Sequence, residues 1–205
     1  MDLIERDDGF WWPANDGWCH KVIHEELPDL DKAVSLTKGK TLAVQAGGNV
    51  GVWANHLAKS FVGVVTVEPD VANYECLKRN VPANVLHRQA GLADQLKVAG
   101  LNKVDGNAGA HYLVGVGDIP IITIDSLNLE ACDLICLDIE GGEPDALRGS
   151  EQTIRKFRPV IMFEEKGLSQ RYYGIPEGTA ERWVLGLGLG YRVKAKVRKD
   201  VILAC

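Results

Sequence analysis

The feature that most constrains the fold is a glycine-rich turn between a short apolar run and an amphipathic stretch. Residues 40–46 (KTLAVQA) have the character of a buried strand, and the turn GGNVG at residues 47–51 follows at once. From residue 50 to 61 large apolar side chains recur every four residues, which predicts an amphipathic helix. A strand, a glycine turn and a helix in this order open an α/β fold with a parallel sheet.

The rest of the chain alternates between short apolar runs and helical stretches, which indicates parallel strands joined by crossover helices. Further strands are predicted at residues 64–67, 85–89, 121–124, 133–138 and 159–163, and further helices at 71–80, 145–157 and 179–185. Residues 91–120 are rich in Gly and Asn and predict a strand pair or excursion. Alternating apolar and basic residues at 191–197, a turn, and an apolar run at 201–205 predict an antiparallel hairpin.

The first 38 residues do not join this alternation and hold three of the five tryptophans. They are predicted to form an N-terminal flap or helical extension (residues 1–38) beside a main domain (residues 39–205). Two interpretations stay open for the extension. It packs on the flank of the sheet, or it forms a lid over a ligand.

Composition narrows the class of protein. Of 205 residues 46% are hydrophobic and 25% are charged, which is typical of an ordered globular chain. The chain has 23 Lys and Arg against 28 Asp and Glu, and the resulting net charge of −5 disfavours a nucleic-acid partner. The acidic N-terminus lacks the pattern of a secretory signal, no apolar run is long enough to span a membrane, and five cysteines without a C-x-x-C favour a reducing compartment. A cytoplasmic location away from membranes is therefore expected.

The glycine turn and an acidic residue form the strongest candidate site. Bare backbone and the start of a helix suit a carboxylate or phosphate. Glu68 lies seventeen residues after Gly51, at the end of the second predicted strand, where a carboxylate can accept both hydroxyls of an adenosine ribose. Asn49 stands where a dinucleotide fingerprint has its second glycine and obstructs a pyrophosphate. A smaller, zwitterionic tail, such as that of S-adenosylmethionine, suits the turn better.

Six sequence blocks in order, from about residue 42 to 165, resemble the motifs of FkbM-type methyltransferases. They are Gly47-Gly48-Asn49-Val50-Gly51 (G-A-N-I-G in the family), Val67-Glu68-Pro69 with Leu77 and Asn80 (F-E-P…L-x-x-N), Ala90-Gly91-Leu92-Ala93-Asp94 (A-A-L-S-D), Asn107-x-Gly109 with Thr123-Ile124-Asp125-Ser126-Leu127 (N-x-G and T-L-D-S-L), Leu137-Asp138-Ile139-Glu140-Gly141-Gly142-Glu143 with Leu147 and Gly149 (I-D-V-E-G-A-E…L-x-G), and Arg158-Pro159-Val160-Ile161-Met162-Phe163-Glu164 (R-P-V-I-x-F-E).

The resemblance implies a Rossmann-like, seven-stranded, mostly parallel sheet with helices on both faces and an antiparallel C-terminal strand. It also implies S-adenosylmethionine as cofactor. The implied cofactor-binding residues are Gln45, Gly47, Gly48, Asn49, Gly51, Glu68, Ala90, Gly91, Leu92 and Asp138. One position departs from the family, because Gln45 stands where an Asp is usual and lacks the charge that would attract the cofactor's ammonium.

Three carboxylates at the ends of adjacent strands are the catalytic candidates. Asp138, Glu140 and Glu164 are expected near the methyl group, where any of them can take the proton of an acceptor hydroxyl. Together they also suit Mg²⁺, although no metal site is assigned. Glu140 and Glu143 alternatively stabilise the start of the next helix.

The expected function is transfer of a methyl group to an oxygen of a sugar, a glycan or a small natural product. A non-catalytic S-adenosylmethionine-binding scaffold or sensor is the main alternative, since Gln45 weakens the expected site. An NAD-type oxidoreductase is less favoured because of Asn49. A nucleobase amino-methyltransferase is disfavoured because Ile139-Glu140-Gly141 replaces the usual Pro-Pro-aromatic motif after Asp138. The acceptor and the oligomeric state are not fixed by the sequence.

Overall fold

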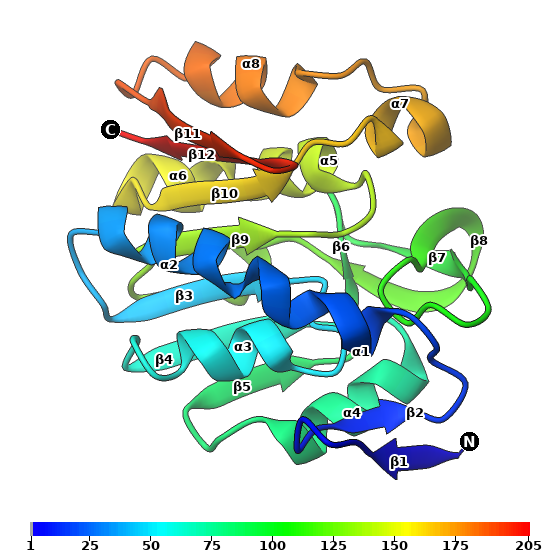
Figure 1. Ribbon diagram of the computed structural model, residues 1–205. Coiled ribbons are helices and arrows are strands. Elements are labelled where there is room, and N and C mark those ends of the chain that lie inside the picture. The colour runs from blue at the N-terminus through cyan, green and yellow to red at the C-terminus, as the bar shows by residue number, and fades with distance from the viewer. Residues whose placement is uncertain (1) are drawn as a thin grey trace.

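A computed structural model describes residues 2–205 (Figure 1). Its centre is a seven-stranded sheet in the order β11-β12-β10-β9-β3-β4-β5. The strands are β3 (Leu42–Ala46), β4 (Gly63–Val67), β5 (Val85–Arg88), β9 (Leu134–Leu137), β10 (Val160–Glu164), β11 (Arg192–Val197) and β12 (Asp200–Ala204).

The pairing confirms the predicted sheet. Strands β10, β9, β3, β4 and β5 run parallel, and β12 pairs antiparallel with both β10 and β11. The central strands β9 and β10 are buried along their whole length, because helices cover both faces of the sheet. This explains why they read as continuous apolar runs in the sequence.

Helices divide between the two faces of the sheet. The apolar side chains of α2 (Leu27–Leu36), α3 (Val52–Leu57) and α4 (Val71–Asn80) pack in one core cluster on one face. Those of α5 (Glu143–Arg148), α6 (Glu151–Phe157) and α8 (Thr179–Gly186) pack in the other (Figure 1). The structure is the Rossmann-like layered fold predicted from the sequence.

The N-terminal residues pack as part of the first core cluster. A short hairpin, β1 (Leu3–Glu5) and β2 (Trp11–Pro13), leads into α1 (Cys19–Val22), a 3₁₀ turn η1 (Ile23–Glu26) and then α2. Trp12 is fully buried and belongs to the same cluster as α3 and the sheet. The Asn80 side chain accepts a hydrogen bond from the Trp11 N–H and donates one to the Trp11 carbonyl, which fixes β2 against α4.

Residues 91–122 form a separate three-stranded sheet in the order β6-β8-β7. It consists of β6 (Gly91–Leu92), β7 (Lys97–Asn102) and β8 (Tyr112–Ile122). The predicted strand pair is therefore present, but the strand expected at 121–124 is the end of β8 and not a strand of the main sheet. After it come the 3₁₀ turn η2 (Asp125–Leu127) and β9.

Two predicted helices differ in length from the observed ones. The helix expected at 50–61 spans only Val52–Leu57. The helix expected at 145–157 is divided into α5 and α6 at Gly149, which passes so close to the backbone of Ala93 that a β-carbon there would lie 2.1 Å from its carbonyl oxygen. Helix α7 (Leu168–Tyr173) lies in a segment where the sequence predicted none.

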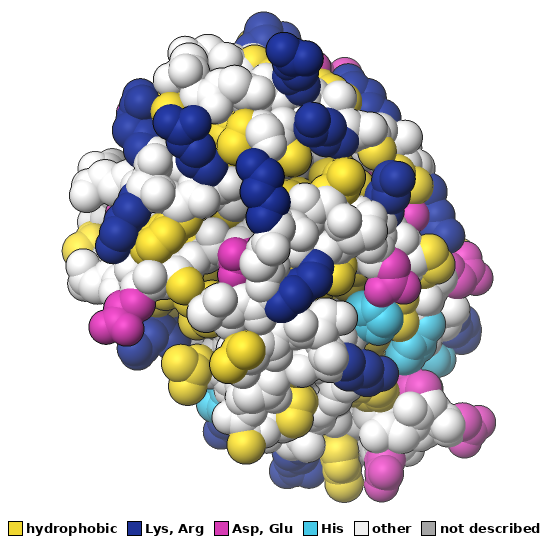
Figure 2. Space-filling model, turned by 90° about the vertical axis from the view of Figure 1, so that its left-hand side faces the viewer, with side chains coloured by type: hydrophobic (Ala, Val, Ile, Leu, Met, Phe, Trp, Pro, Cys, Tyr) yellow, Lys and Arg dark blue, Asp and Glu magenta, His cyan; other side chains and the backbone are white. Residues whose placement is uncertain are grey.

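Figure 2 views the molecule from the left of Figure 1, the side where the core strands begin. Dark blue Lys and Arg side chains are spread over much of its upper half, between apolar and uncharged ones. Within residues 2–205, no helix combines the length and the apolar character needed to cross a bilayer.

The tight turn after β3 generates a stability prediction. Gly47 has φ +77°, and a β-carbon there would lie 1.7 Å from the Asp138 carbonyl oxygen. Gly47→Ala is therefore expected to lower the free energy of unfolding by at least about 1–3 kcal/mol, the usual cost of a strained backbone conformation alone. Urea denaturation measures the change.

Gly186→Ala is the matched control, because a β-carbon at Gly186 in α8 meets no atom within 4 Å. It is expected to be neutral or slightly stabilising. Equal stability of the two variants would contradict this account of the turn.

Candidate functional site

An open cavity lies at the carboxyl ends of β3, β4, β9 and β10, the edge of the sheet where α/β folds bind ligands. Its volume is about 1110 Å³, including the part open to solvent. Its walls come from the glycine turn, the strand ends, the 91–122 sheet and the N-terminal helices. The lining residues used below are Trp18, Cys19, Glu26, Gly47, Gly48, Asn49, Glu68, Leu92, Leu101, Asn107, His111, Leu113, Asp138, Glu140, Lys166 and Lys199.

The glycine turn forms one wall of the cavity, because Gly47 and Gly48 have no side chains and expose their backbone. Gly47 lies directly against the backbone of Asp138, and a β-carbon on Gly48 would lie 2.7 Å from Leu77 and 2.9 Å from the Thr66 hydroxyl. Position 47 therefore requires glycine, whereas a side chain at position 48 requires Leu77 and Thr66 to shift. The close approach also places the end of β9 beside the turn.

Asn49 joins the turn to two distant segments. It has a left-handed φ of +48°, which asparagine tolerates better than most residues. Its side-chain Nδ2 donates to the Ala108 carbonyl at 3.1 Å and contacts the Cys19 Sγ at 3.5 Å. The turn, α1 and the loop before β8 thus meet at one amide.

Glu68 lies at the end of β4 and is only 4% exposed. Its Oε2 accepts the Asn49 backbone N–H at 2.7 Å, and its Oε1 accepts the Asp70 N–H at 2.8 Å. Burial raises the pKa of Glu68 to about 7, although these hydrogen bonds oppose the shift. A carboxylate has about four acceptor positions, so these bonds leave it free to accept more.

Gln45 does not line the cavity, which differs from the expectation for a cofactor-binding residue. Its side chain is fully buried: Nε2 donates to the Gly47 carbonyl at 2.9 Å, and Oε1 accepts from the Thr66 hydroxyl at 2.5 Å. Both ends of the amide are therefore used inside the protein. Gln45 therefore supports the glycine turn from within the core, through its hydrogen bond to Gly47.

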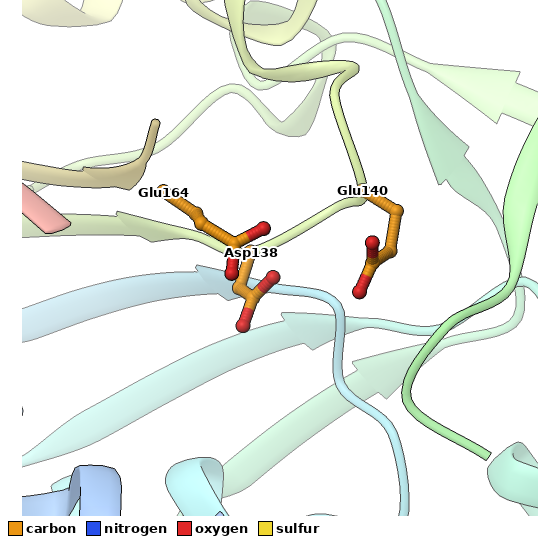
Figure 3. Close-up of side chains that lie close together, drawn as sticks. All are labelled: Asp138, Glu140 and Glu164. Atoms are coloured by element: carbon orange, nitrogen blue, oxygen red, sulfur yellow. The ribbon is translucent and has the colours of Figure 1, made fainter. Parts of the chain in front are cut away.

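The three candidate carboxylates converge (Figure 3). Asp138 follows β9, Glu140 follows two residues later with a left-handed φ of +54°, and Glu164 ends β10. One oxygen atom of each lies within 4.8 Å of the others. Asp138 and Glu140 line the cavity, whereas the buried Glu164 lies behind them.

Two lysines that the sequence interpretation missed hold this cluster together. Lys166 Nζ lies 2.7 Å from Glu164 Oε2 and 3.2 Å from Glu140 Oε1, and Lys199 Nζ lies 2.6 Å from Glu164 Oε1. Burial alone would lower the pKa of each ammonium, but the surrounding carboxylates raise both. Both lysines are therefore charged and cannot act as bases.

The two lysines also argue against a magnesium site in this cluster. A divalent cation would need the carboxylate oxygens as ligands, but Lys166 and Lys199 already lie against Glu140 and Glu164. The donor set does not fit Mg²⁺, and no catalytic step is derived through a metal.

The N-terminal helices supply a wall that the sequence could not place. Trp18, Cys19 and Glu26 line the cavity, and Glu26 Oε1 lies 3.1 Å from Lys199 Nζ. Trp18 is 58% exposed although it is a large apolar residue. Within residues 1–38, β2 and α2 pack in the core, and residues of the 18–26 segment border the cavity.

The other candidates are placed as follows. Leu92 lines the cavity, whereas Gly51, Ala90 and Gly91 do not, and Glu143 accepts the backbone N–H groups of Ile139 and Gly141 outside it. Outside these candidates, His20 contacts Asp16 and His24 contacts Asp8. His111 lines the cavity, and its Nδ1 accepts the Val104 N–H. Tyr172 stacks on Tyr112, and the Tyr173 hydroxyl donates to the Leu113 carbonyl, so these tyrosines fasten α7 to β8.

Comparisons with known proteins give the same fold. The structure is similar to methyltransferase FkbM from Methylobacillus flagellatus KT, with a TM-score of 0.58 and 16% identity, over 92% of this chain and 60% of that one. It is similar to precorrin-6y C5,15-methyltransferase from Geobacter metallireducens GS-15, with a TM-score of 0.54 and 12% identity, over 96% and 92% of the two chains. It is also similar to precorrin 8w decarboxylase from Methanobacterium thermoautotrophicum, with a TM-score of 0.51 and 14% identity, over 88% of this chain and 89% of that one. No curated protein sequence matches the chain.

The sheet order, the glycine turn and the cavity at the strand ends define the class I methyltransferase fold. A family model, "Methyltransferase FkbM domain", matches residues 45–193. The chain belongs to the FkbM methyltransferase domain family, and it spans about 60% of the length of the M. flagellatus protein.

The buried Glu68 generates a pH prediction. Its pKa is about 7 in the folded protein, so the folded state binds more protons than the unfolded state between about pH 4.5 and 7. The contribution of Glu68 to the free energy of unfolding therefore falls as pH rises through this range, by roughly 3 kcal/mol.

Glu68→Gln removes this titration. The free energy of unfolding of wild type minus that of Glu68→Gln should fall by roughly 3 kcal/mol between pH 4 and pH 8, measured by urea denaturation. The exposed Glu130→Gln is the control for loss of a carboxyl at the surface. A difference for Glu68→Gln that does not change with pH would contradict the raised pKa of Glu68.

Proposed function

We propose that the protein is an S-adenosylmethionine-dependent methyltransferase that acts on a hydroxyl of a sugar, a glycan or a small natural product. One observation carries this proposal. A single cavity brings together the bare Gly47-Gly48 turn, the Glu68 carboxylate and the Asp138 carboxylate. Family membership supports the same class of activity.

The cavity residues fit the parts of the cofactor. Gly47 and Gly48 leave room for the amino-acid tail against the backbone, and Glu68 retains acceptor positions for ribose hydroxyls. Leu92, Leu101 and Leu113 supply apolar surface for a flat base. The Gln45 side chain lies outside the cavity, so its lack of charge does not affect this fit directly.

The chemistry needs little from the protein beyond position and a proton acceptor. The bound cofactor supplies an electrophilic methyl group. The chain must hold the acceptor oxygen in line, exclude water and take the hydroxyl proton. Asp138 is the best-placed acceptor, because it lines the cavity and makes no ion pair among the described residues. Glu164 is held by two lysines and is not free to do so.

Trp18 favours a sugar ring as the acceptor. An exposed indole at the cavity wall offers a flat apolar face, which suits the C–H face of a sugar. Asn107 and Glu140 in the same cavity supply polar groups for its hydroxyls. The combination of one aromatic platform and several hydrogen-bonding groups supports a sugar more than a purely apolar acceptor.

Calorimetry tests the cofactor. S-adenosylmethionine and S-adenosylhomocysteine are expected to bind in the micromolar range, and NAD is expected not to bind. Glu68→Ala should weaken binding by about 10- to 100-fold, because hydrogen bonds to a charged group contribute about 1.5–3 kcal/mol. Glu130→Ala should leave affinity unchanged. Binding of NAD in place of the two methionine derivatives would overturn the proposed function, and an unchanged affinity of Glu68→Ala would remove its ribose role.

The acceptor class is tested with Trp18. Methyl transfer from labelled S-adenosylmethionine to a panel of saccharides and phenolic natural products identifies an acceptor. With a saccharide, Trp18→Ala should raise KM for the acceptor by about 2- to 10-fold, the contribution of an aromatic contact. Trp18→Phe should restore most of the loss, and cofactor affinity should not change. An acceptor KM that Trp18→Ala leaves unchanged would exclude the stacking role.

A further inference from the structure

The carboxylate cluster beside the cavity has an uneven number of charges. Asp138, Glu140 and Glu164 lie within 4.8 Å of one another, and only two ammonium groups, Lys166 and Lys199, lie among them in the described chain. With every group ionised the cluster carries one uncompensated negative charge. In a partly buried site such a charge is costly, and it favours retention of one proton.

The groups packed around the cluster do not balance this charge. Glu26 approaches Lys199 from η1, the buried Asp200 pairs in register with Glu164 from β12, and the Cys19 thiol faces Asp138 from α1. Glu143 faces Glu164 from the start of α5. None of these groups carries a positive charge, so none of them compensates the excess negative charge of the cluster.

Asp138 is the member of the cluster that is placed to hold the proton. Glu164 contacts both ammonium groups and Glu140 contacts one, but no ammonium pairs with Asp138 within residues 2–205. Its Oδ1 is buried and has no hydrogen-bond partner in the described structure. Burial and the neighbouring Glu164 raise the pKa of Asp138 well above its ordinary value, which agrees with this placement.

We propose that Asp138 exchanges its proton for the positive charge of the cofactor: binding expels the proton, and methyl transfer returns one. This inference rests on the proposed function. In the free protein Asp138 is a neutral acid, and the cluster has no net charge. A sulfonium in the cavity restores neutrality only if Asp138 ionises and releases its proton to solvent.

The reaction then balances. The bond between sulfur and the methyl carbon breaks, its electron pair stays on sulfur, and the acceptor oxygen forms the new bond to the methyl carbon. Asp138, now a carboxylate, takes the hydroxyl proton. The thioether product is uncharged at sulfur, and the cluster is neutral again with Asp138 protonated. Asp138 is therefore a base only while the methyl donor is bound.

The experiment measures proton release on binding. Calorimetric titrations at pH 6 in two buffers of different ionisation enthalpy give the number of protons released. S-adenosylmethionine, and sinefungin with an ammonium in place of the sulfonium, should each release on the order of one proton more than S-adenosylhomocysteine. The three ligands share the same nucleoside and amino-acid tail, so the difference reports the charge near sulfur.

Asp138→Asn provides the matched variant, because an amide cannot titrate. The excess release with S-adenosylmethionine should disappear, while affinity for S-adenosylhomocysteine stays within a few-fold. Asp118→Asn, at an exposed site in β8, should keep the excess. If Asp138→Asn does not fold, wild type still tests the inference. The preference for S-adenosylmethionine over S-adenosylhomocysteine should rise with pH, up to tenfold per unit below the pKa of Asp138.

The outcomes separate the two proposals. Equal proton release by the charged and uncharged ligands, or an excess that persists in Asp138→Asn, would overturn the proton exchange and leave the proposed function intact. Failure of all three ligands to bind would overturn both.

Discussion

The close approach of Gly47 to the Asp138 carbonyl is the constraint on which the site depends. No side chain separates the two backbones, so the turn after β3 and the end of β9 lie side by side. This contact sets the floor of the cavity. Glu68 then closes the other side, because its carboxylate joins the turn to the end of β4. The positions of the glycine turn, Glu68 and Asp138 follow from these two contacts between neighbouring strands.

The buried polar groups near the cavity differ in how completely they are paired. Gln45 and Thr66 satisfy each other beneath the turn, so this part of the core is neutral and rigid. One strand further, the acids after β9 and β10 are only partly balanced by Lys166 and Lys199. Buried groups that are fully paired add stability, whereas an incompletely paired group stays reactive. Where the family usually has an Asp, Gln45 adds no charge to this part of the core.

Much of the fold was predictable because it depends on local signals. The apolar runs at 40–46 and 159–163, the glycine turn and the alternation at 191–197 all reflect burial or a backbone requirement of the residues themselves. Gly149 shows the limit, since the break between α5 and α6 arises from Ala93, far away in the sequence. The lysines of the cluster were missed because no local pattern marks them. Lys166 and Lys199 have no motif, and only the antiparallel insertion of β12 next to β10 brings Lys199 to Glu164.

That insertion makes the cavity depend on a contact between distant segments. Strand β12 lies inside the sheet, between β10 and β11. The turn before it carries Lys199, which reaches Glu164 at the end of β10 and Glu26 in η1. Without β12 in place, the sheet would have an unfilled gap and the acidic cluster would lose one of its two ammonium groups. Pairing of β12 therefore completes both the sheet and the charge balance of the cavity.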